Sequence, residues 1–285
     1  MNDNFKDLKD LLNSLNVTIS TKIETTIEPV KGTSETTKED FFSANKKWHK
    51  FDDIVVVFVD LEASTNLSNQ IKTDEGLARV YNIIMGTAVT IFDNYDASFV
   101  DIQGDGGFAI FWGSNRYLQA LVSAITIQTI NRKMMSTITE KYPNVTSKGL
   151  KIGIASGPAL VKKVGLSQKL AKSANGQDDG WEEPVWSGNP VNYAAKASQS
   201  VSGGNIVITK SVKKSIDHYI NLTKTCGCAV DENQKLLDMQ GVVTDVWERF
   251  KIEKIESEES EGYVNSNSWC PRHGNEYADD LLGMQ

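Results

Sequence analysis

Cysteine is scarce in this sequence of 285 residues, and its three cysteines, Cys226, Cys228 and Cys270, form an odd number. Small secreted domains that depend on disulfides are dense in cysteine and usually contain an even number of them. The count and the spacing therefore argue against a disulfide framework. We expect a protein of a reducing compartment, the cytoplasm.

The sequence also lacks an excess of basic residues and a long apolar segment. Its formal net charge is −7, whereas proteins that bind nucleic acids usually carry a basic face, so we expect no nucleic-acid partner. No apolar run approaches the roughly 20 residues that span a membrane, and the first residues, MNDNFKDLKDLL, lack a secretory apolar core. With 40% hydrophobic and 24% charged residues, the composition is that of a globular protein without a membrane partner.

The composition changes along the chain and suggests three regions. Apolar residues recur at helical spacing between residues 3 and 16, which predicts a short amphipathic helix. Residues 17–40 are rich in Thr, Lys and Glu, which is typical of a loosely held arm. We expect a helix and arm over residues 1–45, a globular domain over 46–255, and a tail over 256–285. The tail begins with the acidic segment ESEESEG, which is predicted to be solvated.

The globular domain alternates strand and helix patterns. The run IVVVFV at residues 54–59 is apolar and rich in β-branched residues, which is typical of a central strand covered on both faces. After it the pattern predicts a helix that is capped by Ser64 and Thr65 and reaches about residue 92, and then strands on both sides of QGDGG. A helix at about 115–136 and a strand pair over 150–165, turning at Gly157-Pro158, are predicted next. The last predicted elements are a helix from Asn189, a strand at 205–209, a helix at 210–219 and a strand at 242–252. The order β-α-β-β-α-β predicts an α+β fold of ferredoxin-like type, with helices on one face of a mostly antiparallel sheet.

Two aspartates stand at the ends of predicted strands. Asp60 directly follows the apolar run, and Asp105 lies in the glycine-rich turn of the next strand pair. In a β-α-β-β unit these two places can lie side by side, where close carboxylates repel each other unless a cation neutralises them. Oxygen ligands favour Mg²⁺ or Mn²⁺, and two cations bridged by two aspartates suit phosphoryl or nucleotidyl transfer. Alternatively, each aspartate only caps a strand or forms a turn.

The turn that follows Asp60 leads into the predicted helix. The free backbone N–H groups of a helix N-terminus attract phosphate. Together with the hydroxyls of Ser64 and Thr65, they predict a phosphate-binding site next to the two carboxylates.

Three motifs resemble those of the class III nucleotidyl cyclases. FVDLEAST, residues 58–65, resembles the first metal motif of that family, F-x-D-I/L-x-G-x-T. GDGGFAIF, residues 104–111, resembles the second, and SGNPVNYAAKAS, residues 187–198, resembles the third, G-x-x-V-N-x-A-x-R. The resemblance covers about residues 50–252, and the three motifs occur in the family's order.

The resemblance implies a cyclase catalytic domain in residues 46–255 and a role for each motif. Asp60 and Asp105 would bind two Mg²⁺ or Mn²⁺ ions per active site, with the Leu61 carbonyl as a further ligand. Asn192 would orient the ribose, and Lys196 would stabilise the charge of the transition state. Cyclases of this family form head-to-tail homodimers with shared sites, in which the aspartates come from one subunit and the asparagine and the cation from the other.

Four positions depart from the family pattern. Lys196 stands in place of an arginine, and it keeps the charge but lacks the planar bidentate fork. Asp101 and Val185 occupy the purine-selecting positions, where neither the adenine-type nor the guanine-type residue pair is present. Gln240 aligns with a lysine that contacts phosphate in relatives.

With these departures, the chain is similar to the pyrimidine cyclases of the Pycsar antiphage systems. That resemblance implies a lyase that converts UTP, favoured over CTP, to the cyclic monophosphate, a second messenger for a separate effector protein. Two alternatives are a catalytically degenerate module that only binds nucleotides, and an adenylate or guanylate cyclase with an atypical base pocket.

The cysteines raise a further possibility. Cys226, Cys228, Cys270 and His273 could supply the four ligands of a tetrahedral zinc site. The single residue between Cys226 and Cys228 is shorter than the gaps of two to four residues that zinc sites prefer. Free cysteine is also commonly just a small buried apolar residue. A structural zinc site is therefore the less favoured interpretation.

Overall fold

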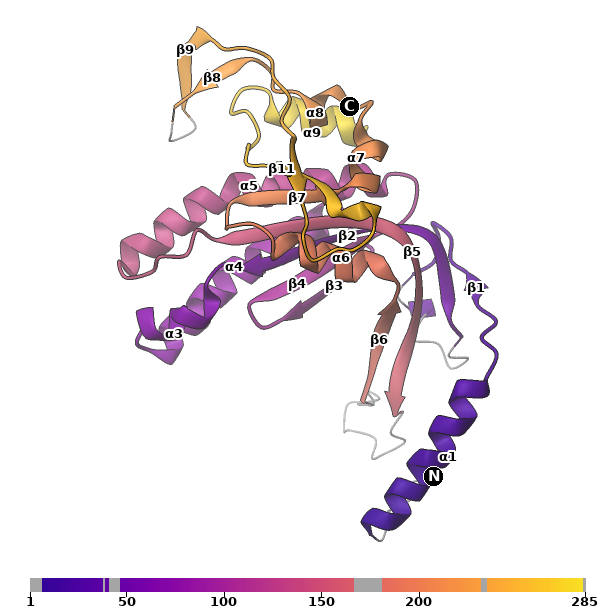
Figure 1. The fold of residues 1–285 in the computed structure, drawn as a ribbon. Helices are drawn as coiled ribbons and strands as arrows, with labels where there is room; N and C mark the ends of the chain where they lie inside the picture. Colours follow the sequence, from indigo (N-terminus) through magenta and orange to yellow (C-terminus); the bar gives the residue numbers. More distant parts are fainter. Residues whose placement is uncertain (1–6, 38, 41–46, 167–180, 232–234, 284–285) are drawn as a thin grey trace.

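The structure is a computed structural model that describes residues 7–37, 39–40, 47–166, 181–231 and 235–283 (Figure 1). Most of these residues form one α/β body, beyond which α1 and a small hairpin extend at opposite ends of the view. Within the described ranges, no helix combines the length and the apolar character needed to cross a membrane.

A mixed sheet organises the body. Its strands follow the order β10-β11-β7-β5-β2-β4-β3, with β1 added beside β2 and β6 beside β5. Only the pairs β1–β2 and β5–β7 are parallel. The bounds are β1 Val30–Lys31, β2 His49–Leu61, β3 Phe99–Gln103, β4 Gly106–Phe111, β5 Leu150–Leu166, β6 Trp181–Ser187, β7 Asn205–Thr209, β10 Glu248–Lys251 and β11 Glu261–Asn265. A separate hairpin consists of β8 Cys228–Val230 and β9 Leu236–Gln240.

The helices differ greatly in length. The long ones are α1 Leu8–Glu24, α4 Asp74–Asn94 and α5 Arg116–Lys141. The shorter ones are α3 Leu67–Gln70, α6 Asn189–Ser198, α7 Lys210–Ile216, α8 Ile220–Thr223 and α9 Gly274–Leu282, with 3-10 turns at Ser64–Asn66 and Glu258–Ser260.

The centre of the body has the predicted ferredoxin-like topology. Along the chain, β2, α4, β3, β4, α5 and β5 form a βαββαβ unit, and its strands lie in the order β5-β2-β4-β3. The first strand of the unit is therefore paired on both sides, by β5 and by β4. The expectation of a mostly antiparallel α+β sheet is confirmed, but helices cover both of its faces and not one, since α6 packs on the face opposite α4 and α5.

The apolar run of β2 is buried because the sheet is covered on both faces. Val57 packs into a core that includes Ile84 of α4 and Leu121 of α5. Val56 points to the other face and packs in a second core with Ala194 of α6. Side chains alternate between the faces of a strand, so a central strand covered twice needs apolar residues at successive positions.

The N-terminal region is more ordered than the sequence suggested. The first helix continues to Glu24, well into the Thr-rich segment predicted to be a loose arm. Further along that segment, Val30 and Lys31 pair in parallel with His49 and Lys50 of β2. Parts of the segment predicted to be a linker or loosely held arm thus have regular structure, although α1 buries none of its residues.

The predicted strand pair over residues 150–165 is one continuous strand. Gly157 has a φ of +146°, but the chain does not reverse there. Instead, the pairing of β5 with β2 shifts register between Phe51 and Ile54, opposite Gly157. The Gly-Pro pair thus marks an irregularity in a long bent strand, and not the hairpin that its composition favours.

The acidic segment after residue 255 is exposed over residues 256–258, as predicted, but it leads into the main sheet and not into a free tail. Its last glutamate, Glu261, starts β11, which lies between β10 and β7 in the main sheet. The Glu261 carboxylate lies 3.0 Å from the Lys210 ammonium. The predicted last strand over 242–252 is shorter than expected, since β10 covers only Glu248–Lys251.

Candidate active site

The two motif aspartates lie side by side at one end of the β2–β4 ladder. Asp60 is the cross-strand partner of Gly106, the residue after Asp105. The Leu61 N–H donates a hydrogen bond to the Asp105 carbonyl oxygen at 3.1 Å. The expected juxtaposition of strand end and hairpin turn is therefore present, and backbone pairing alone fixes it.

Glycine at position 106 keeps the space beside Asp60 open. A Cβ atom there would lie 3.3 Å from the Asp60 Oδ1 and 3.1 Å from the Val59 carbonyl oxygen. In the same turn, Gly104 has a φ of +66°, a conformation that glycine adopts without strain. The sequence G-D-G-G thus both closes the hairpin and leaves room at the carboxylate.

A lysine that the sequence reading missed stands next to this pair. Lys151 on β5 is the other cross-strand partner of Asp60, and its ammonium forms an ion pair with the Asp60 carboxylate. Both side chains are largely buried, at 16% and 24% exposure. The carboxylate position therefore already attracts a cation. The signal was a single lysine in the otherwise apolar strand LKIGIA.

The segment after β2 differs from the predicted helix start. Ser64 and Thr65 lie inside a 3-10 turn, and neither makes a side-chain capping bond. The long helix α4 begins later, where the Thr73 hydroxyl accepts a hydrogen bond from the Gly76 N–H. The expectation that Ser64 and Thr65 cap this helix is wrong, although both residues remain beside the carboxylates in sequence.

Ala63 makes the turn itself unusual. Its φ is +56°, in the left-handed region that L-residues other than glycine rarely adopt. The cyclase motif has glycine at this position, so this chain keeps the turn but adds a Cβ. Such a conformation costs about 1 kcal/mol or more, and the surrounding structure must stabilise it.

Tyr81 on α4 lies near Asp105, on the helix side of the site. Burial and the nearby Asp105 carboxylate both raise the pKa of its hydroxyl. Tyr81 therefore stays protonated at neutral pH and can donate a hydrogen bond at the edge of the site.

The other two predicted catalytic residues lie on α6. This helix packs directly on β5, where a Cβ at Gly153 would overlap the Ala194 carbonyl. Asn192 is exposed and Lys196 is half-buried. In the part of the chain that the structure describes, no hydrogen bond or ion pair joins either side chain to Asp60 or Asp105.

An aromatic surface lies on the same face of the sheet as α6. Phe58 stacks on Phe108 with ring centroids 6.4 Å apart, and Phe99 lies 6.1 Å from Phe108. These three rings are only partly buried. Along β2, Val56, Phe58 and Asp60 alternate with Val57 and Val59, whose side chains point to the opposite face. Phe58 and the rings that contact it therefore lie on the α6 face of the sheet, as Asp60 does.

The two predicted base-pocket residues lie on strands that do not pair with each other. Asp101 is half-buried on β3, and its Oδ2 accepts a hydrogen bond from the Gln103 amide at 3.1 Å. Val185 on β6 is 44% exposed and pairs with Lys162 of β5. No contact between Asp101 and Val185 is evident within the described chain.

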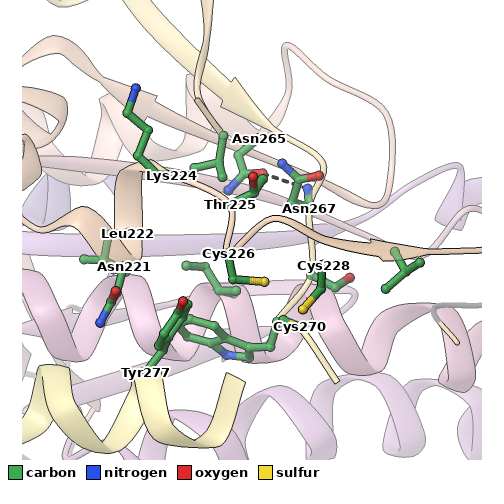
Figure 2. A pocket seen from close by; sticks show the side chains of 15 residues that line it. Asn221, Leu222, Lys224, Thr225, Cys226, Cys228, Asn265, Asn267, Cys270 and Tyr277 are labelled. Atoms are coloured by element: carbon green, nitrogen blue, oxygen red, sulfur yellow. Dashed lines mark hydrogen bonds between the residues drawn. The ribbon is translucent and has the colours of Figure 1, made fainter. Parts of the chain in front are cut away.

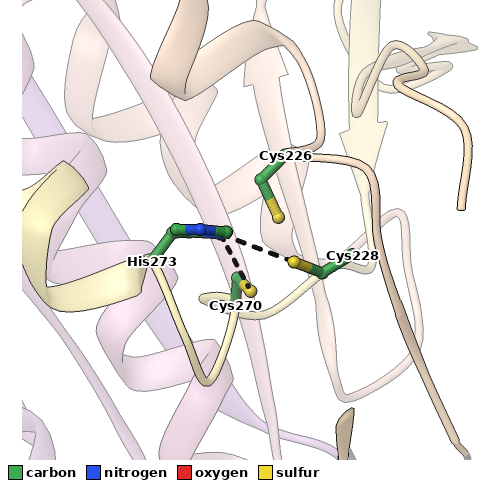
Figure 3. A group of neighbouring side chains, drawn as sticks. All are labelled: Cys226, Cys228, Cys270 and His273. Carbon is green, nitrogen blue, oxygen red and sulfur yellow. Dashed lines mark hydrogen bonds between the residues drawn. The ribbon is translucent and has the colours of Figure 1, made fainter. Parts of the chain in front are cut away.

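The four predicted zinc ligands come together away from the carboxylates. The ligand atoms of Cys226, Cys228, Cys270 and His273 all lie within 4.8 Å of one another (Figure 3). Cys226 lies just before the β8–β9 hairpin, Cys228 is the first residue of β8, and Cys270 and His273 come from the turn before α9. Spacing in the sequence made this set the less favoured interpretation, but the fold assembles it.

Comparison with known proteins agrees with this geometry. The sequence matches the adenylate and guanylate cyclase catalytic domain over residues 47–241. A uridylate cyclase of Micromonospora echinofusca is 34% identical over 279 residues, which are 97% of this chain and 84% of the relative. A cytidylate cyclase of Staphylococcus aureus is 25% identical over 249 residues, which are 82% of this chain and 53% of the relative.

A solved structure supports the fold independently of sequence. A bacterial light-regulated adenylyl cyclase superposes with a TM-score of 0.54 at 13% identity, covering 99% of this chain and 71% of that one. The family match extends over more than half of the chain and contains the ladder that places Asp60 beside Asp105. The chain therefore belongs to the adenylate and guanylate cyclase catalytic domain family and is a class III nucleotidyl cyclase.

Proposed function

We propose that this cyclase converts a pyrimidine nucleoside triphosphate, UTP in preference to CTP, to its 3′,5′-cyclic monophosphate and pyrophosphate. The observation that carries the proposal is the intact carboxylate pair, Asp60 beside Asp105, in a chain similar to a uridylate cyclase over nearly its whole length. The similarity to the cytidylate cyclase is lower and covers less of that protein, which favours UTP.

The carboxylate pair fits divalent cations. Asp60 and Asp105 supply oxygen ligands, the Gly106 backbone leaves space beside the Asp60 carboxylate, and the Leu61 carbonyl is next in the chain. Two bound Mg²⁺ or Mn²⁺ ions would supply the charge that activates the 3′-hydroxyl and stabilises the leaving pyrophosphate. In their absence the Lys151 ammonium offsets the charge of Asp60.

The aspartates and the α6 residues act, in this proposal, across a dimer. Asn192 is exposed, and Lys196 is half-buried on the α6 face of the sheet. The half-buried rings of Phe58, Phe99 and Phe108 give that face an apolar surface that a second copy of the chain can cover. Asn192 of one subunit would then hold the ribose above the other subunit's carboxylates. Lys196 would stabilise the charge that develops on the phosphate.

The base and the phosphates would contact two further places. The Asp101 carboxylate is an acceptor, which suits the N–H donors that uracil and cytosine carry on their pairing edges, and Val185 offers an apolar contact on a different strand. The hydroxyls of Ser64 and Thr65 follow Asp60 within five residues and are proposed phosphate contacts.

The proposed biological role is second-messenger synthesis in antiphage defence, and the resemblance to the Pycsar cyclases supports it. The product would activate a separate effector that recognises the cyclic pyrimidine nucleotide. Because nucleoside triphosphates are cytoplasmic metabolites, we place the reaction in the cytoplasm.

Incubation with each of the four ribonucleoside triphosphates tests the proposal. Purified protein is supplied with Mn²⁺ or Mg²⁺, the products are identified by mass spectrometry, and pyrophosphate is measured in parallel. We expect cyclic UMP as the main product, exceeding cyclic CMP at least about tenfold, since a hydrogen-bonding base pocket discriminates strongly. Saturable triphosphate binding without pyrophosphate release would instead identify a non-catalytic binding module. A cyclic purine nucleotide as main product would establish an atypical base pocket.

A further inference from the structure

We propose that Cys226, Cys228, Cys270 and His273 bind one structural zinc ion that fastens the C-terminal segment to the β8–β9 hairpin. This site is separate from the proposed cyclase chemistry and does not depend on it.

Two distances in the cluster are close to those of a tetrahedral site. The Cys228 Sγ lies 3.5 Å and the Cys270 Sγ 3.8 Å from the His273 Nδ1 (Figure 3). Zinc bonds of about 2.3 Å to sulfur and about 2.0–2.1 Å to nitrogen place sulfur and nitrogen about 3.5 Å apart at tetrahedral angles. One ion at the centre of the four atoms would reach all of them with little movement.

Hydrogen bonding alone does not explain the arrangement. An imidazole nitrogen carries either one proton or one lone pair, yet two sulfur atoms converge on the same Nδ1. A third thiol, Cys226, lies within the same 4.8 Å group, and all three cysteines are free. A shared cation satisfies the three sulfurs and the nitrogen together.

The local backbone explains why the short Cys-Gly-Cys spacing works. Gly227 has a φ of +78°, and its carbonyl accepts a hydrogen bond from the Gly241 N–H at 2.8 Å. The positive φ of Gly227 bends the chain between Cys226 and Cys228, and the sulfurs on both sides of this bend lie in the same cluster of ligand atoms. Glycine adopts this conformation without strain, so a one-residue gap is sufficient here.

The partner ligands are held by the turn before α9. Cys270 and His273 are three residues apart, and the Cys270 carbonyl accepts a hydrogen bond from the Gly274 N–H at 2.8 Å. The Arg272 N–H points at the Cys270 sulfur at 3.4 Å, an outer contact that orients a metal-binding thiolate. Nearby, the Trp269 indole N–H donates to the Thr126 hydroxyl on α5 at 3.0 Å.

The surroundings indicate a structural ion and not a catalytic one. The three thiols line a cavity of about 170 Å³ together with Trp269 and Tyr277 (Figure 2). The Tyr277 ring also stacks on His273, with centroids 5.8 Å apart. Four protein ligands leave no open position for water or substrate, which is the coordination of structural zinc sites. Sulfur-rich tetrahedral ligand sets select zinc over Mg²⁺ or Mn²⁺.

Metal analysis of the untagged full-length protein tests the proposal. Protein purified in reducing, chelator-free buffer is measured for zinc, iron, copper, nickel and manganese by plasma mass spectrometry. We expect about one zinc per chain and, after exchange with Co²⁺, the visible absorption of a tetrahedral thiolate site. A strong chelator should lower the melting temperature by at least about 5 °C. Zinc-free protein that takes up no Zn²⁺ on titration would overturn the proposal, as would a disulfide between two of the cysteines.

Matched variants separate this site from adventitious binding. Cys270→Ser and His273→Ala should lose at least about four fifths of the zinc, because three ligands hold the ion far less tightly. The control His218→Ala removes an exposed histidine that stacks on Tyr219 outside the cluster, and it should keep the full amount. Asp105→Asn should also keep its zinc. Equal zinc content in all four variants would place the metal elsewhere and reject the assignment.

Discussion

The carboxylate pair and the thiol cluster solve the same geometric problem in different ways. Asp60 and Asp105 are 45 residues apart in the sequence, and so are Cys228 and His273. The carboxylates are placed by a regular strand ladder, in which Asp60 pairs with Gly106. The thiols are placed by the start of the separate β8–β9 hairpin and by the turn before α9, both outside the main sheet. The two sites therefore have the same sequence separation, but only the carboxylate site follows from the strand topology.

The two sites also differ in whether one chain completes them. The thiol cluster gathers all four proposed ligands within a single chain. The carboxylate site is open, because within the described residues neither Asn192 nor Lys196 forms a hydrogen bond or ion pair with the aspartates, and Asn192 is exposed. We therefore expect the thiol site to act in folding and the carboxylate site to require a second subunit. Three experiments test this contrast.

Replacing an aspartate should have the largest effect. Asp105→Asn should lower cyclic nucleotide formation by at least about a thousandfold, since a neutral amide weakens cation binding worth several kcal/mol in the transition state. The melting temperature should change little, because the ladder that holds this residue is made by backbone atoms. Initial rates and thermal unfolding, measured on the same preparation, check both statements.

Asp52→Asn is the matched control for this change. Asp52 lies on β2, the strand of Asp60, its side chain is 71% exposed, and it forms an ion pair with Lys31 at 3.8 Å. It should keep full activity. Substantial turnover by Asp105→Asn, with unchanged metal dependence, would remove the carboxylate from the chemistry.

The carboxylate pair could be predicted from the sequence because its causes are local. An apolar run of strand length and a glycine-rich turn each define a strand end, and the β-α-β-β order brings those ends together. The ferredoxin-like core followed from the same patterns. Neither prediction depended on the course of the chain after β5.

The thiol cluster was harder to predict, because its assembly depends on segments whose structure the sequence pattern indicates poorly. Residues 256–260 are acidic and read as a solvated tail, yet β11 follows at once and enters the sheet between β10 and β7. That strand carries the chain back over α5, where Cys270 meets the hairpin. The ion pair between Lys151 and Asp60 was not predicted for a related reason, because a single lysine in β5 does not indicate which residue of β2 lies opposite it.

Mixing two inactive variants tests the shared site, and it should restore a moderate activity. Asp105→Asn and Lys196→Ala proteins are each expected to be nearly inactive. In a two-fold symmetric dimer, half of the dimers formed after free exchange are mixed, and each has one intact site of two, so about a quarter of wild-type activity should return. Subunit exchange is followed by fluorescence transfer between labelled chains.

A second mixture provides the control. Asp105→Asn combined with Asp60→Asn puts both defects in the carboxylate half, so every site in the mixed dimer stays damaged and no activity should return. The thiol site should show no complementation of any kind, because each chain carries its own four ligands. Exchange without recovery in the first mixture would place all four catalytic residues in one subunit.

The smallest effect is expected from Lys151→Met, which probes how the carboxylate site is held before cations arrive. Lys151 competes with a metal ion for Asp60, and both side chains are largely buried. Removing it should lower the melting temperature of the metal-free protein by roughly 2–4 °C, since Asp60 loses a partner worth about 1 kcal/mol. The Mn²⁺ concentration that gives half of the thermal stabilisation should fall about fivefold, because a repelling charge is gone.

Lys148→Met removes an exposed lysine three residues away, whose backbone N–H and not its side chain bonds to Glu62, and should change neither quantity. Weaker Mn²⁺ binding by Lys151→Met would mean that the lysine orients the carboxylate for the metal and does not compete with it. In that case the side chains of a single chain would prepare the carboxylate site for its cation, as they do at the thiol cluster. The contrast between the two sites would then rest on the dimer alone.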